Sequence, residues 1–192
     1  MATVVGNRAP FINLVFTITS KWWTYRDGVL HRGLDIATGH EDPVVSMLDG
    51  YVIDVGYNDS AGNYIIIACK DVNSGYFGFA TRYIHLKTLP LYNVGDYVSL
   101  NEVVGIENNT GSSQGTHLHV EMQNVYLNTP QWTWHVSNEK TDYIDPTAFM
   151  GIDNVEGTQW IYYGIIPPVP SSNKHKFKWV LYANNIRKRN KL

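Results

Sequence analysis

The chain of 192 residues contains little cysteine, little charge and no long apolar run. Its single cysteine, Cys69, excludes an intramolecular disulfide framework and a zinc site built from several thiolates. No apolar run approaches the roughly 18 residues that a membrane helix needs, so no membrane span is expected. The 17% charged and 13% aromatic residues exclude a disordered chain. We therefore expect a globular domain in which any metal ion is held by histidine and carboxylate side chains.

A long amphipathic helix pattern is also missing. Short runs of β-branched and aromatic residues alternate with turns rich in Gly, Asn and Asp, and only residues 141–150 favour a short helical turn. This pattern predicts an all-β fold, a sandwich or barrel of short antiparallel strands. The predicted strands are Phe11–Ile18, Pro43–Met47, Tyr51–Val55, Tyr64–Cys69, Thr81–Leu86, Val103–Ile106 and Leu118–Met122.

The C-terminal part differs in composition from the rest. A proline-rich run over 165–172 is typical of a stiff, extended linker. We expect a domain over 1–165, a linker over 166–172 and a basic tail over 173–192. The tail has a net charge of +7 and the rest of the chain −9, so the tail could contact an anionic polymer such as teichoic acid, nucleic acid or a membrane surface, or simply be a solubilising terminus. The start of the chain has no basic-then-apolar secretory leader.

The most informative segment reads GTHLHVEM over residues 115–122. Its apolar residues alternate with polar ones, which is typical of a strand with one buried face. His117, His119 and Glu121 therefore share the opposite face. Two imidazoles about 7 Å apart on one strand suit a metal ligand beside a proton-transfer group, because one cation does not easily bind both. Polar histidines on an exposed strand face, without a metal, are the alternative.

Two further segments supply candidate partners. His31 and Asp35 lie in HRGLDIA, residues 31–37. Together with one histidine of the later strand they make two nitrogens and one carboxylate, a set that leaves a fourth zinc position open, as in catalytic sites. His85 lies in TRYIHL, where alternation puts it on the polar face of its strand. A hydrogen-bonded surface pair, and a half-buried histidine bonded to backbone, are the alternatives.

In chain order, the motifs His-x-x-x-Asp, Tyr-x-His-Leu and Gly-x-x-x-Gly-Thr-His-Leu-His-Val-Glu resemble the lysostaphin/LytM-type zinc metallopeptidases, which cleave peptide bonds in bacterial peptidoglycan. The similarity covers about residues 15–150. It implies the antiparallel β-sandwich/barrel hybrid of that family, with short helical turns only. It also implies one Zn²⁺ ion bound by His31, Asp35 and His119. The two remaining histidines, His85 and His117, then match the family's non-ligand histidines beside the water and the scissile carbonyl.

The chain departs from the family pattern before its first implied ligand. Where the family usually has a Gly-Phe-Gly-x-Arg-like turn, residues 20–28 read SKWWTYRDG, in which Arg26 could keep the arginine. The bulky Trp22 and Trp23 change this wall of the cleft. His40 lies in a loop and is not expected to bind metal. Glu121 is not the base in this family, and we expect it to support the ligands or the fold.

The resemblance implies hydrolysis of a peptide bond in the stem peptide or cross-bridge of peptidoglycan by metal-activated water, with histidine acid/base assistance. A catalytically silent LytM-like scaffold or wall-binding module is the alternative. We expect action at the cell wall, outside the cell, by a phage lysin, a virion-associated domain or the excised catalytic part of a bacterial autolysin. Bacterial peptidoglycan is the expected partner, and no specific nucleic acid is expected because no recognition motif is present. We expect a monomer or part of a larger virion or multidomain protein.

Overall fold

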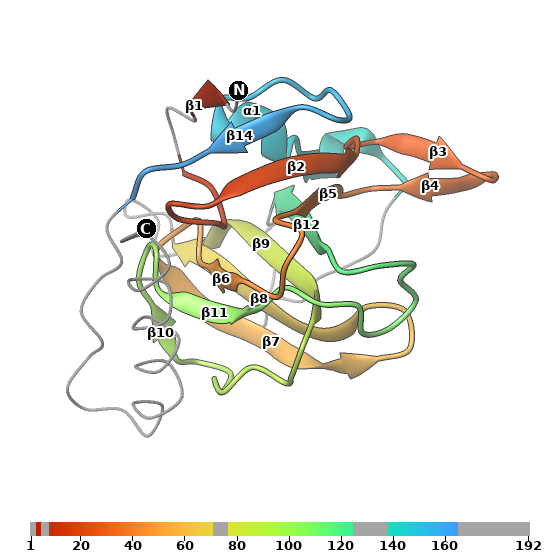
Figure 1. Ribbon diagram of the computed structural model, residues 1–192. Coiled ribbons are helices and arrows are strands. Elements are labelled where there is room, and N and C mark those ends of the chain that lie inside the picture. The colour runs from red at the N-terminus through yellow and green to blue at the C-terminus, as the bar shows by residue number, and fades with distance from the viewer. Residues whose placement is uncertain (1–2, 5–7, 71–76, 125–137, 165–192) are drawn as a thin grey trace.

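Short strands make up most of the molecule (Figure 1). The computed structural model describes residues 3–4, 8–70, 77–124 and 138–164. In that part of the chain the helical segments are one 3-10 turn, η1 (Lys140–Asp142), and one short helix, α1 (Pro146–Met150). The all-β prediction and the short helical turn expected over 141–150 are thereby confirmed. None of these helical segments is long and apolar enough to cross a membrane.

The predicted linker over 166–172 and the basic tail over 173–192 lie outside the described residues. The division of the chain into domain, linker and tail therefore stays a prediction.

One large sheet forms the body of the molecule. Its order is β1-β14-β2-β5-β12-β9-β8-β7-β10, and β13 pairs with β12 off this path. Its neighbours are antiparallel except for the parallel pair of β1 and β14. The strands are β1 (Thr3–Val4), β2 (Val15–Ser20), β5 (Leu34–Ala37), β7 (Gly50–Asn58), β8 (Gly62–Lys70), β9 (Phe77–Leu86), β10 (Tyr97–Val98), β12 (Leu118–Asn124), β13 (Tyr143–Ile144) and β14 (Gln159–Ile161).

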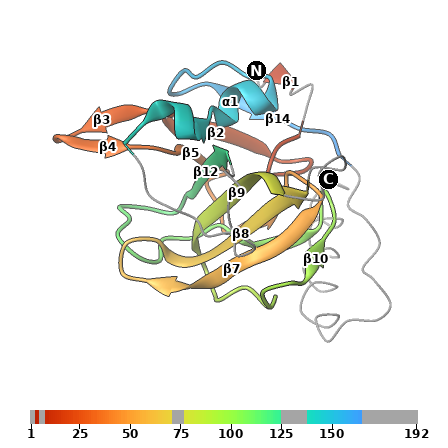
Figure 2. The same cartoon turned by 180° about the vertical axis from the view of Figure 1, so that it is seen from behind.

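A second pair of strands closes the core. β6 (Pro43–Val45) and β11 (Val103–Ile106) are antiparallel and lie on one face of β7–β9, in front of them in Figure 1 and behind them in Figure 2. Val44 and Val104 of this pair are fully buried in one cluster with Ile65 and Ile67 of β8. The packing of two layers around these apolar side chains is the sandwich-like arrangement that alternating strands favour.

A hairpin projects from the body beside the large sheet (Figures 1 and 2). It consists of β3 (Thr24–Arg26) and β4 (Val29–His31). Its two turn residues have positive φ, +48° at Asp27 and +79° at Gly28, which is the conformation that a two-residue hairpin turn requires. The hairpin ends at His31, so it delivers the first candidate ligand to the sheet.

The central strand β12 is buried on both faces. Leu118, Val120 and Met122 lie in the apolar core, as the alternation predicted. The opposite face is covered as well, since His119 and Glu121 are only 7% and 8% exposed. The polar side chains of β12 are therefore part of a buried site.

Candidate metal and catalytic site

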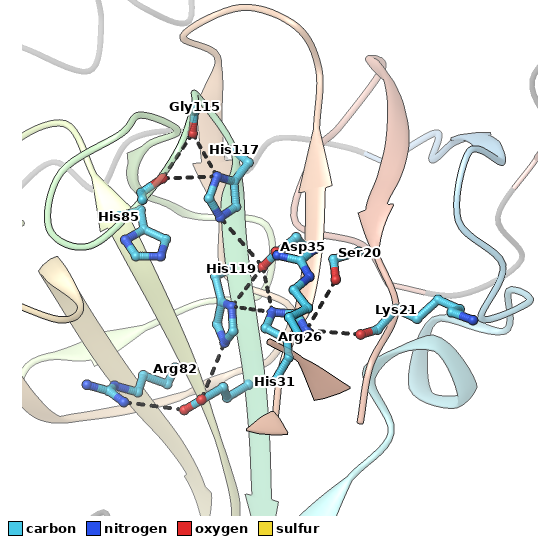
Figure 3. A network of polar contacts seen from close by, with 12 residues as sticks. Ser20, Lys21, Arg26, His31, Asp35, Arg82, His85, Gly115, His117 and His119 are labelled. Atoms are coloured by element: carbon cyan, nitrogen blue, oxygen red, sulfur yellow. Dashed lines mark hydrogen bonds and ion pairs between the residues drawn. The ribbon is translucent and has the colours of Figure 1, made fainter. Parts of the chain in front are cut away.

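The candidate ligands meet where β4, β5 and β12 come together (Figure 3). Asp35 of β5 and His119 of β12 are direct partners across the antiparallel ladder. His31 is the last residue of β4 and reaches the same point from the hairpin. Residues that lie 84 and 88 positions apart in the chain are thus brought side by side.

Three donor atoms of this cluster form a small triangle. His31 Nε2 lies 3.0 Å from Asp35 Oδ1, and His119 Nδ1 lies 2.7 Å from the same oxygen. The two nitrogens are 2.9 Å apart. Two imidazoles and one carboxylate that converge in this way could hold a metal ion.

The second nitrogen of each imidazole has its own acceptor. His31 Nδ1 donates to the Lys21 carbonyl oxygen at 3.0 Å, and His119 Nε2 donates to Glu121 Oε1 at 3.3 Å. His31 Nε2 and His119 Nδ1 are thereby both aimed at the Asp35 carboxylate, where either a proton or a metal ion can be shared. Outer partners of this kind orient metal-binding histidines.

The charges of the cluster are strongly coupled. Burial alone would raise the pKa of Asp35, but its hydrogen bonds with His119 and His31 hold that pKa far below its ordinary value. Burial alone would lower the pKa of His119, yet its bonds to Asp35 and Glu121 raise the pKa to about 9. The Asp35 carboxylate is therefore ionised and attracts positive charge into the triangle.

Gly33 makes room for the cluster. A Cβ atom placed on this residue would lie 2.1 Å from His119 Nε2, which is shorter than any contact that a Cβ atom makes without forcing its neighbour to move. The glycine inside His-x-x-x-Asp is thus required by the close approach of the His119 ring.

His85 and His117 lie beside the triangle. Their ring centroids are 4.9 Å apart, and His117 Nε2 lies 3.5 Å from Asp35 Oδ1. Both Nδ1 atoms donate to backbone carbonyls, His85 to Thr110 at 2.8 Å and His117 to Gly115 at 2.7 Å. In each ring the Nε2 lone pair therefore stays available.

The alternation along β9 does not hold at His85. Simple alternation would put Tyr83, two residues earlier, on the same polar face, but Tyr83 is fully buried and its hydroxyl accepts from the Met47 N–H at 2.7 Å. His85 has a φ of +64°, a left-handed conformation that breaks the strand alternation. The register of β8 and β9 also shifts nearby, between the pairs of Asn63 and Ile65. The strain at this position is what aims His85 at the cluster.

His85 is held in its neutral form. Burial lowers its pKa to about 4, and the positive charge of His119 acts in the same direction. At neutral pH its Nε2 is therefore a hydrogen-bond and proton acceptor.

Two arginines flank the triangle. Arg82 of β9 lies directly opposite Glu121 in the ladder, and its guanidinium is 3.3 Å from Glu121 Oε2. Arg26 of β3 lies 3.3 Å from Asp35 Oδ2, with half of its side chain exposed. The contact of Arg26 agrees with the arginine expected before the first ligand. Arg82 was missed, because a sequence does not reveal which residue faces Glu121 across the sheet.

The structure brings all the candidate residues of the sequence analysis into one cluster. His31, Asp35 and His119 form the triangle, and His85 and His117 lie next to it. His40 is exposed in its loop and is not part of the metal-binding group found among the described residues. Glu121 contacts His119 as a supporting side chain, the role that the sequence suggested for it.

Comparison with known proteins identifies the family. A sequence model described as Peptidase family M23 matches residues 29–140, more than half of the chain. The chain belongs to peptidase family M23. The His-Asp-His triangle, which could hold a metal ion, lies within the matched region.

Two relatives are similar over about half of this chain. A protein of Buchnera aphidicola described as an uncharacterized metalloprotease is 38% identical over 92 residues, which cover 48% of this chain and 23% of the relative. The peptidoglycan DD-endopeptidase ShyA of Vibrio cholerae is 35% identical over 92 residues, 48% of this chain and 20% of ShyA. The chain thus matches about a fifth of the length of these relatives.

Solved structures of the family have the same fold. The chain is similar to a zinc-containing peptidase from Vibrio cholerae, with a TM-score of 0.55 and 28% identity, over 73% of this chain and 39% of that one. The catalytic domain of lysostaphin from Staphylococcus simulans is similar with a TM-score of 0.51 and 22% identity, over 70% and 89% of the two chains. These neighbours confirm the expected LytM-type β fold.

Proposed function

We propose that this M23 member is a zinc-dependent endopeptidase that hydrolyses peptide bonds in the stem peptide or cross-bridge of bacterial peptidoglycan. The observation that carries the proposal is the convergence of His31 Nε2, Asp35 Oδ1 and His119 Nδ1, with two further histidines beside them. ShyA, a relative described as a peptidoglycan DD-endopeptidase, supports this substrate class.

The donor set fits zinc. Zn²⁺ is bound by imidazole nitrogens and carboxylate oxygens, and catalytic sites use three protein ligands. His31, Asp35 and His119 would hold the ion, and the Lys21 carbonyl and Glu121 would keep the two rings in the required tautomers. When bound, zinc supplies Lewis-acid polarisation of a carbonyl group and acidification of water.

The two remaining histidines would move protons. His85 is neutral, and its Nε2 can take a proton because its Nδ1–H is committed to the Thr110 carbonyl. His117 is fixed in the same way by Gly115, and its Nε2, 3.5 Å from Asp35 Oδ1, would donate to a developing oxyanion when it carries a proton. We therefore assign proton acceptance to His85 and stabilisation of a developing oxyanion to His117.

The test compares alanine variants of the two histidines on purified bacterial walls. His85→Ala and His117→Ala should each keep one equivalent of zinc and lose about 10²-fold or more in turnover, the usual scale for acid–base groups. Mass spectrometry of the released muropeptides, with and without chelator, measures the activity. His40→Ala is the matched control, because His40 is exposed and should leave both zinc content and turnover unchanged.

Two results would contradict the proposal. Turnover at the wild-type level in either variant would remove that histidine from the mechanism. A zinc-loaded wild-type protein that releases nothing from any wall chemotype would instead be a silent scaffold or wall-binding module. The wall as the site of action follows from the proposed substrate, while a phage origin and contact of the basic tail with wall polymers stay predictions.

A further inference from the structure

A solvent-open pocket adjoins the metal-binding triangle on the side of His31. It encloses about 330 Å³, and its walls include Lys21, Trp22, Trp23, Lys140 and Asn154. Lys21 belongs to both sites: its carbonyl oxygen accepts from His31 Nδ1, while its side chain points away from the histidines (Figure 3). The pocket is thus connected to the triangle through Lys21 and the His31 ring.

The walls of the pocket are built rigidly. The Asn154 side chain accepts from the Trp22 N–H at 3.0 Å and donates to the Trp22 carbonyl at 3.2 Å. Trp23 packs against Trp22 and Tyr143, with ring centroids 5.6 and 5.3 Å apart. Trp23 also has a φ of +54°, which is uncommon for a bulky residue and persists only where surrounding contacts enforce it.

The charge lining the pocket is mainly positive. The Lys140 ammonium lies over the Trp22 ring, 4.6 Å from its centroid, and this cation–π contact holds the lysine side chain at the wall of the pocket. Lys21 adds a second ammonium group. The acid of the pocket, Asp145, is already engaged, because its Oδ1 accepts from the Thr147 N–H at 2.8 Å and from the Thr147 hydroxyl at 2.6 Å. A small anionic group is the complementary ligand.

We propose that this pocket is a substrate subsite that binds a carboxylate-bearing residue next to the scissile bond, through Lys140 and Lys21 over the Trp22–Trp23 wall. The inference rests on the proposed function and narrows its substrate class, because a positively charged subsite favours anionic stem peptides over uncharged cross-bridges of glycine. The two tryptophans and Lys140 provide a contact that the usual Gly-Phe-Gly turn of the family does not supply.

The test uses matched pairs of substrates and variants of the zinc-loaded protein. The substrates are cross-linked muropeptide dimers with free carboxylates, and the same dimers after carbodiimide coupling to ammonia. We expect amidation to raise the wild-type KM about tenfold, the scale of a charge-assisted hydrogen bond discounted for exposure, with little change in kcat. Lys140→Gln should raise KM for the free acid about tenfold and leave KM for the amide unchanged, whereas Lys140→Arg should behave like wild type. Lys87→Gln, which removes an exposed lysine outside the pocket, is the control and should show the same difference in KM between the two dimers as the wild type.

Calorimetric titration of the same dimers gives a binding readout that does not depend on turnover. Equal affinity of the wild type for both dimers, or an equal loss for both in Lys140→Gln, overturns the subsite. Absence of cleavage by the wild type, with the expected difference in binding retained, overturns the proposed function and leaves the subsite standing.

Discussion

Two buried glutamates differ in charge at neutral pH: Glu121 is ionised and Glu107 is protonated. Glu121 is 8% exposed and Glu107 is fully buried. Burial would raise both pKa values, but for Glu121 the hydrogen bond and charge of His119, and then Arg82, lower the pKa to about 2. The hydrogen bonds of Glu107 come from the uncharged Thr38, and its pKa rises to about 8.

The difference shows what burial alone does not decide. A buried carboxylate keeps its charge only where nearby cations offset the free-energy cost of its lost hydration, and it otherwise takes up a proton. Glu121 stays charged because two cationic groups lie against its carboxylate: His119 Nε2 is 3.3 Å from Oε1 and the Arg82 guanidinium is 3.3 Å from Oε2. Glu107 is a neutral acid: its backbone pairs with Leu86 at the end of β9, and its side chain accepts a hydrogen bond from the Thr38 hydroxyl. The two residues therefore form a matched pair for testing.

The largest effect should follow removal of the imidazole between Glu121 and Asp35. His119→Ala deletes a proposed zinc ligand and leaves Glu121 without that cationic partner. We expect zinc affinity to fall by more than about 10²-fold, beyond the loss caused by outer partners. Equilibrium dialysis with metal analysis measures it, with His40→Ala as the control. Retention of one equivalent of zinc at wild-type affinity would refute the ligand assignment.

The same substitution at the two glutamates should separate their roles. Glu121→Gln removes the charge that orients His119 and should weaken zinc binding about 10- to 100-fold. Glu107→Gln should leave zinc affinity unchanged, because Glu107 bonds to Thr38 rather than to a proposed ligand. Competition with a zinc chelator measures both variants. Equal losses in the two variants would contradict the distinction.

The pH dependence of stability should single out Glu107. Its pKa is raised from 4.5 to about 8 by folding, so its contribution to stability is complete below pH 4.5 and is lost as pH rises through about 8. Glu107→Gln cannot ionise and should be more stable than wild type at pH 9, by about 5 kcal/mol, with little difference at pH 4.5. Denaturant unfolding at the two pH values measures this. A difference that does not depend on pH would show that folding does not raise the pKa of Glu107.

The smallest effect should come from the exposed arginine. Arg26 and Arg82 both lie 3.3 Å from a carboxylate of the cluster, but the Arg26 side chain is 50% exposed and that of Arg82 only 14%. Arg26→Gln should change zinc affinity less than about fivefold in either direction, since exposed pairs contribute about 1 kcal/mol at most. Arg82→Gln should have the larger effect, because it leaves Glu121 buried with one cation fewer. If Arg26→Gln lowered zinc affinity more than Arg82→Gln in the chelator assay, the exposed arginine of the hairpin would control zinc binding more than the buried arginine of the sheet.

Much of the site could be predicted because its information is local. The alternation around His119 placed it opposite the apolar side of β12, and the sandwich-like fold followed from short runs between turns. The direction of His85 could not be predicted, since a φ of +64° interrupts the alternation that the prediction assumed. Arg82 was missed for a related reason: its pairing with Glu121 depends on the register between two strands.

By itself, the sequence determined the chemistry available to this protein. A single cysteine left histidine and carboxylate as metal ligands, and a period of two put His119 and Glu121 on one side of a strand. Only the tertiary structure decided which charges those groups carry and where the walls of the pocket stand. Asn154 fixes Trp22 from 132 positions away, and Glu107 and Glu121 differ in charge through partners that are distant in the chain. Periodicity is a property of neighbouring residues, whereas burial and electrostatics depend on contacts that exist only after the strands have paired.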